Sequence, residues 1–218
     1  MSKRAIAGAA ALLAAPIIVI PGTLAQPTLS DDAARQVAAL TDHRGAMITS
    51  MALSSIAIVL LIAGIIWFAV ALAAYAPRLA MAGGVLGVLG SLAVLSENSI
   101  AAAFPAIVGR LDRIEATSVL DRIHSGAITA LGPLSITGDI GLALLGLAAV
   151  KAGAPRWAGA AIAVGALAGG AGFATGTRAL VIIAFAVLFL GLLQAVRTLV
   201  ASPAPRLPAA VPHTAAVS

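Results

Sequence analysis

Long apolar runs, separated by short polar connections, fill most of this chain, and six of them are near the length that a helix needs to cross a membrane. Twenty helical residues span about 30 Å, the thickness of the hydrocarbon core. The pattern therefore predicts an all-α polytopic membrane protein, a six-helix bundle forming one domain over residues 1–200. The expected spans are residues 5–24, 47–75, 79–108, 126–150, 157–175 and 179–200.

Two connections outside the spans are expected to carry short amphipathic helices. Ser30-Asp31-Asp32 is a typical helix start ahead of the apolar residues Val37 and Leu40. In the second connection, residues 109–125, Ser118 followed by Asp121 resembles a capping box. These residues predict that the fourth long helix begins near Val119, before it enters the bilayer.

Composition narrows the class further. With 61% hydrophobic and 10% charged residues, the chain does not fit a water-soluble globule. It contains no cysteine, which excludes disulfides, thiolate nucleophiles and cysteine-ligated metals. Residues 201–218 carry four prolines and no apolar run, so we expect a disordered cytoplasmic tail.

The charged residues indicate topology rather than nucleic-acid binding, because the basic ones stand at the ends of apolar runs. The basic residues expected on one side, with no acid among them, are Lys3, Arg4, Arg78, Lys151, Arg156, Arg197 and Arg206. The loop carboxylates all fall on the other side, at Asp31, Asp32, Asp42, Asp112, Glu115 and Asp121. The first side is predicted to be cytoplasmic, with both termini there and with the connections 25–46 and 109–125 external.

The first apolar run also resembles a signal peptide, with small residues at Thr23 and Ala25 before a polar segment. Because the run is long enough to span, we favour a retained first helix. The predicted partners are the lipid bilayer and, at the external loops, a protein partner.

Two carboxylates interrupt the apolar runs, and they are the first candidates for function. A carboxylate inside a span is costly and usually faces a protein interior or a water-filled cavity. At the rise of an α-helix, Glu97 lies about 27 Å beyond Leu79, and Asp139 lies about 18 Å before Lys151. Both distances are measured from the predicted cytoplasmic ends of their helices, so they put Glu97 near the outer mouth and Asp139 near the midplane.

With Ser96, Asn98 and Ser135, these two acids form a predicted outward-facing polar pocket. The alternative is that each carboxyl is protonated or bonded to a neighbour and only ties helices together. Small residues at spacings of three and four predict the helix contacts that keep the acids away from lipid. These residues are Gly83, Gly87 and Gly90 beside Glu97, then Gly132, Ser135, Ala143 and Gly146 beside Asp139, and Gly165, Gly169, Gly172 and Gly176 in the fifth span.

Two histidines form a second candidate site. His43 and His124 each stand at the outer start of an inward-running helix, in similar sequences. If they converge, their imidazoles could hold haem b or a transition metal. The favoured alternative is ordinary interfacial histidines bonded to Asp42, Asp121 or water, since no third residue has ligand spacing. No cofactor is predicted.

Motifs for common enzyme chemistry are absent from the sequence: it has no P-loop, no H-E-x-x-H, no G-x-S-x-G and no G-x-G-x-x-G after a strand. We therefore do not expect an enzyme.

The connection Gly146 to Gly159 has the pattern G-x-x-x-x-x-x-G-x-P-R-W-x-G, which includes Pro155, Arg156 and Trp157. It resembles the connection found in a bacterial family of six-helix membrane proteins, domain of unknown function family 4386. That resemblance implies a bacterial inner-membrane protein and no particular reaction, substrate or catalytic residue.

The leading hypothesis is a non-enzymatic membrane protein that binds or passes a small polar species or a proton in the predicted pocket. The alternatives are a redox or metal-binding subunit that uses the two histidines, and a membrane-anchored interaction protein that docks a partner on its external helices.

Overall fold

The computed structural model describes residues 2–26, 33–123, 125–126 and 129–201. Over these residues the chain forms α-helices and no strand, and six of the helices are long and apolar enough to cross a membrane. They are α1 (Lys3–Ala25), α3 (Arg44–Leu72), α4 (Pro77–Val108), α6 (Thr129–Lys151), α7 (Arg156–Ala174) and α8 (Arg178–Ala201). The prediction of an all-α six-span bundle is confirmed. The predicted helix cap at residues 30–32, His124 and the tail beyond residue 201 lie outside the described residues.

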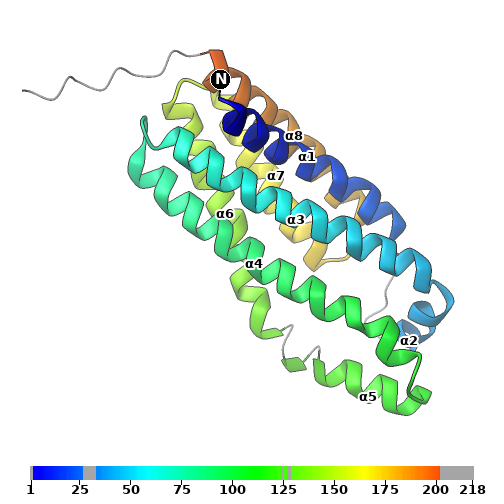
Figure 1. The fold of residues 1–218 in the computed structure, drawn as a ribbon. Helices are drawn as coiled ribbons and strands as arrows, with labels where there is room; N and C mark the ends of the chain where they lie inside the picture. The colour runs from blue at the N-terminus through cyan, green and yellow to red at the C-terminus, as the bar shows by residue number, and fades with distance from the viewer. Residues whose placement is uncertain (1, 27–32, 124, 127–128, 202–218) are drawn as a thin grey trace, which may run out of the picture.

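The six long helices form a ring in which each one packs on the next in the chain, and α8 packs back on α1 (Figure 1). Short connections between consecutive helices favour this antiparallel arrangement. We call the end of the bundle that holds residues 3 and 201 the terminal end. The opposite end, which holds α2 (Ala33–Asp42) and α5 (Arg113–Ile123), is the loop end.

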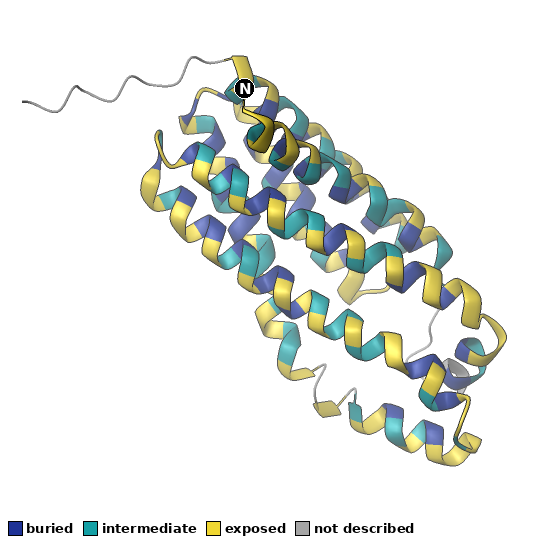
Figure 2. Cartoon of the chain, in the orientation of Figure 1, coloured by how far each residue is buried: buried dark blue, intermediate teal, exposed yellow. Residues whose placement is uncertain are grey.

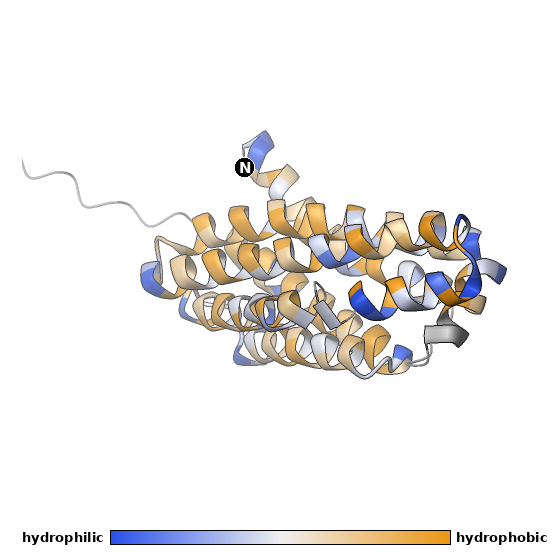
Figure 3. Ribbon diagram, turned by 90° about the horizontal axis from the view of Figure 1, so that it is seen from below, coloured by the Kyte–Doolittle hydropathy of each residue, from blue (hydrophilic) through white to orange (hydrophobic). Residues whose placement is uncertain are grey.

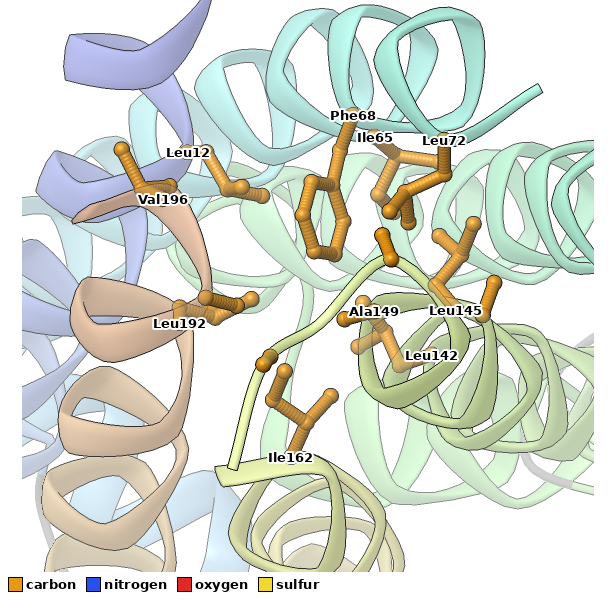
Figure 4. Close-up of a cluster of buried hydrophobic side chains, with 14 of the residues drawn as sticks. Leu12, Ile65, Phe68, Leu72, Leu142, Leu145, Ala149, Ile162, Leu192 and Val196 are labelled. Atoms are coloured by element: carbon orange, nitrogen blue, oxygen red, sulfur yellow. The ribbon is translucent and has the colours of Figure 1, made fainter. Parts of the chain in front are cut away.

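An apolar core fills the ring in the half nearer the terminal end (Figure 4). Phe68, Ile65 and Leu72 of α3 are completely buried there, at 0% exposure. Around them lie Leu12, Leu142, Leu145, Ala149, Ile162, Leu192 and Val196, which come from α1, α6, α7 and α8. These buried side chains fill the terminal half of the ring with apolar atoms. We call this cluster the inner core.

The surface of the bundle is largely apolar, as lipid contact requires. Large side chains such as Val70 and Met81 are 71% and 70% exposed, and the buried residues form stripes that face neighbouring helices (Figure 2). Hydrophilic residues gather at the two ends of the bundle (Figure 3).

A second apolar cluster lies at the loop end, outside the ring. Helices α3 and α4 have 29 and 32 residues, or about 44 and 48 Å, so they extend past the hydrocarbon core. The amphipathic helices α2 and α5 cover the extended parts. The buried members of the cluster are Val37, Leu40, Met47, Met51, Phe104, Val108, Ala116 and Leu120.

The sequence suggested that the fourth long helix begins near Val119. In the structure no helix starts there, because Val119 lies inside α5. Asp112 caps α5 instead, because its Oδ1 accepts hydrogen bonds from the amides of Ile114 and Glu115, both at 2.9 Å. Ser118 therefore lies inside α5 and does not cap a helix. At the other end of α5, the Ser125 hydroxyl donates to the carbonyl of Asp121, and the next described long helix is α6 (Thr129–Lys151).

Candidate functional site

The residues of the predicted pocket lie on α4 and α6, two helices that are in close contact. A Cβ placed on Gly90 would overlap the backbone of Gly138, and one placed on Gly141 would lie 2.6 Å from the Cα of Gly87. The two helix backbones touch here, which only glycine permits. We call these four residues the glycine seam.

The sequence pattern identified only part of this seam. It selected Gly87 and Gly90 but missed Gly138 and Gly141. It also selected Gly132, where an added Cβ would meet no atom within 4 Å, and Gly146, which packs on α7.

Asp139 lies one residue past Gly138, on the side of α6 that faces α7. A Cβ on Gly170 of α7 would meet the Asp139 carboxylate, with its Cγ only 3.0 Å away. Gly170 therefore makes the space that the carboxylate occupies, and spacing patterns did not single it out. The Asp139 side chain is partly buried. No hydrogen bond to it is found among the described residues.

Glu97 and Asn98 are neighbours on α4, yet their surroundings differ. The Nδ2 of Asn98 donates to the Met51 carbonyl at 3.0 Å and to the Ser55 hydroxyl at 2.6 Å, which ties α4 to α3. Glu97 is partly buried, and its Oε1 is buried without a hydrogen-bond partner in the described part of the chain. The helix-tying role thus belongs to Asn98 rather than to the carboxylate beside it.

The remaining predicted pocket residues bond within their own helices. Ser96 donates to the Leu92 carbonyl at 2.9 Å, and Ser135 donates to the Gly132 carbonyl at 2.7 Å. Ser135 precedes Asp139 by about one helical turn, so both lie on one face of α6.

The glycine seam sets the relative depths of the two acids. Gly90 lies level with Gly138, beside Asp139, and Glu97 comes two turns after Gly90 on α4. Glu97 is therefore about 10 Å nearer the loop end than Asp139. The two carboxylates therefore lie at different levels of the bundle and are not a directly bonded pair.

The packing of α6 changes at Asp139. From residue 129 to residue 140 no residue of α6 is buried, whereas Gly141, Leu142, Leu145 and Gly146 all are. The loop-end half of this helix is loosely covered, and the terminal half is locked into the inner core. Asp139 stands at the boundary between the two.

His43 precedes α3 and lines a separate pocket of about 550 Å³ at the loop end, together with Asp42, Gln26 and Arg178. Arg178 donates to the backbone carbonyl of Gln26 there. Sequence reasoning missed this pocket because its walls come from the ends of α1, α2, α3 and α8. His124 lies outside the described residues, so the two-histidine site stays a prediction. No group of three or more potential metal ligands occurs in the described ranges.

No protein-family model, curated protein or solved structure matches this chain, so the resemblance to domain of unknown function family 4386 stays a prediction.

Proposed function

We propose that this protein resides in a bacterial cytoplasmic membrane with both termini in the cytoplasm, and that it binds or passes a small polar species or a proton in a polar pocket open to the outer face. The pocket contains Glu97, Asn98, Ser135 and Asp139. One observation carries the proposal: Asp139 stands inside a spanning helix, without a hydrogen bond among the described residues, where α6 changes from unburied to buried.

A purely structural role fits Asp139 poorly. Buried polar groups that hold helices together are hydrogen-bonded, because an unpaired polar atom in an apolar setting is costly. Asn98 meets that description through two bonds to α3. Asp139 makes no such bond within the described ranges, and the missing side chain of Gly170 leaves it room. An ionisable side chain in a span carries a free-energy cost. Exchange of a proton or a ligand at Asp139 is the best explanation for its presence there.

The proposed orientation follows from the charges in the sequence. The connections at the terminal end carry basic residues and no acid, whereas the connections at the loop end carry every loop carboxylate together with Arg44, Arg110, Arg113, Arg122 and Arg178. With the terminal end in the cytoplasm, the loosely covered half of α6 faces outward, and the inner core closes the cytoplasmic side.

Infrared difference spectroscopy of the protein in lipid nanodiscs tests the proposal. The carbonyl stretch of a protonated carboxyl is resolved from the amide bands and follows its protonation directly. We expect a carboxyl band that responds to bulk pH in the wild type and is missing in Asp139→Asn, which preserves the side-chain shape. A wild-type spectrum without a pH-responsive carboxyl, or one that Asp139→Asn leaves unchanged, would show that water does not reach Asp139.

A further inference from the structure

The terminal ends of α6, α7 and α8 form one corner of the bundle, because α7 packs on both other helices (Figure 1). Gly153, in the turn between α6 and α7, has a φ of 98°, which favours glycine. A Cβ placed on it would lie 4.0 Å from the Thr198 Cγ2 of α8. The turn thus brings Lys151 and Arg156 to the part of α8 that carries Arg197. We call these three cations the basic corner.

Two glycine contacts put the three cations at one level of the bundle. Gly146 of α6 and Gly191 of α8 both pack on residues 158–162 of α7. Counted from the middle of that segment, the cations on α6, α7 and α8 lie about 8, 6 and 9 Å toward the terminal end. All three are exposed. They therefore lie within about 3 Å of one another along the bundle axis.

No acidic side chain neutralises the basic corner. The sequence has no aspartate or glutamate after Asp139 and none before Asp31. Asp139 is about 18 Å from Lys151 along α6, and the other acids are nearer the loop end. Within the described ranges, none of the three cations has an ion pair or a side-chain hydrogen bond. The positive charge of this corner is thus turned outward, to the surroundings of the protein.

Helix dipoles and membrane topology do not account for this convergence. Lys151 is in the last turn of α6, where the dipole favours a cation. Arg156, however, begins α7, where the dipole disfavours a cation, and the N-cap Pro155 makes no side-chain hydrogen bond to the helix start. The topology rule requires basic residues on the cytoplasmic side but not their gathering at one corner. An anion from outside the chain is what would offset the charge at Arg156.

The surface next to the basic corner is apolar. Trp157 follows Arg156 and is 55% exposed, and tryptophan is enriched at the level of the lipid headgroups. One or two turns from Lys151, Trp157 and Arg197, on the same helix faces, lie exposed apolar side chains. They are Leu147, Val164 and Leu190. The corner therefore offers positive charge at one level and apolar contact just beyond it.

From three cations without an acid beside an exposed apolar surface, we infer that the basic corner binds the headgroup of an anionic phospholipid. The guanidinium and ammonium groups bond to its phosphate oxygens, and its acyl chains lie along α6, α7 and α8. A zwitterionic lipid also brings a cation, which finds no acid here, so the anionic lipid is preferred. The corner lies at the other end of the bundle from the proposed pocket, and the inference does not depend on that pocket.

Quenching of tryptophan fluorescence by brominated lipids tests the inference in bilayers. The chain has two tryptophans, so Trp67→Phe leaves Trp157, inside the corner, as the only one. This protein is reconstituted in phosphatidylcholine that contains a rising fraction of phosphatidylglycerol with brominated acyl chains. A parallel series uses phosphatidylcholine with the same brominated chains. Comparison of the two series gives the relative binding constant of the anionic lipid beside Trp157.

The matched variants remove one charge at a time. Lys151→Gln, Arg156→Gln and Arg197→Gln are made singly and together in the Trp67→Phe protein. Arg110→Gln, which removes an exposed cation at the loop end, is the control. A Tm measured for each variant shows that it is folded.

We expect phosphatidylglycerol to be preferred over phosphatidylcholine beside Trp157 by about tenfold or more, because each basic residue near the surface favours an anionic lipid by about fivefold. Each single variant in the corner should lower that preference by about two- to fivefold, and Arg110→Gln should keep it. Equal quenching by the two lipids would overturn the inference, as would a preference that the triple variant retains.

Glycerol 3-phosphate distinguishes a lipid from a soluble phosphate, because it carries the phosphate without acyl chains. Added at constant ionic strength, it should leave the quenching unchanged. Displacement of the brominated lipid would show that the corner is a site for a soluble anion, and the lipid inference would be wrong.

Native mass spectrometry repeats the comparison with both tryptophans in place, so that the result does not depend on Trp67→Phe. After exchange into equal amounts of the two lipids, phosphatidylglycerol adducts should outnumber phosphatidylcholine adducts on the wild type and decline in the triple variant. Equal numbers of the two adducts on the wild type would contradict the inference.

Discussion

Gly141→Ala should separate α4 from α6, because its new Cβ has no space. At its ideal position that atom would lie 2.6 Å from the Gly87 Cα and 2.7 Å from the Gly83 carbonyl oxygen. Ordinary van der Waals contact begins at 3.4 Å, and both obstacles are backbone atoms that cannot rotate away, so the helices must move apart. Overpacking of this kind costs about 1–3 kcal/mol.

Gly132→Ala is the matched control on the same helix, since no atom lies within 4 Å of its Cβ position. It should be neutral or stabilise by up to about 1 kcal/mol, because alanine is the better helix former. Thermal unfolding in detergent, followed by tryptophan fluorescence, measures both variants. For a chain of this size we expect Gly141→Ala to lower Tm by about 2–12 °C. Equal Tm values for the two variants, or a Gly141→Ala protein as stable as the wild type, would refute the close contact.

Three other predictions concern the structure around the site. Asn98→Ala should lower the free energy of unfolding by about 1–2 kcal/mol through loss of its two bonds to α3, whereas Ser99→Ala should change it little; equal losses in the same unfolding assay would argue against the tie. Asp112→Ala should remove the cap of α5 at a cost of about 1 kcal/mol, seen as faster hydrogen exchange confined to α5, and unchanged exchange there would contradict the cap. A topology reporter fused after Val200 should be active only in the cytoplasm, and periplasmic activity would reverse the proposed orientation.

Much of the fold could be predicted from the sequence, because a membrane imposes length and polarity on each span. Every predicted span overlaps a long helix, with ends that differ by a few residues. The clear miss was the helix start expected near Val119, because α5 already begins at Arg113. The sequence analysis chose Ser118 as the cap, whereas in the structure Asp112 accepts the two backbone hydrogen bonds at the start of α5.

The candidate site was only partly accessible from sequence. Glu97 and Asp139 stood out because charges are rare in spans. The contacts of Asp139 could not be predicted in the same way. Helix α6 presents Gly138 and Gly141 to α4, but it presents Asp139 and Gly146 to α7. A spacing rule identifies small residues but does not say which neighbouring helix each one contacts. Those contacts are known only once the order of the helices in the ring is known. The tie made by Asn98 was hidden for the same reason, as its partners lie far away in the chain, on α3.

The central claim is a pocket open to the outer solution and closed by the inner core, and single-cysteine accessibility tests it most directly because the natural chain contains no cysteine. Ser135→Cys, which is nearly isosteric, probes the pocket, and Ala149→Cys, at a position 1% exposed in the inner core, probes that core. A charged, membrane-impermeant thiol reagent is added to either side of oriented vesicles. We expect modification of Ser135→Cys from the outer side only and of Ala149→Cys from neither side. An unreactive Ser135→Cys, or an Ala149→Cys that reacts readily from either side, would contradict the account.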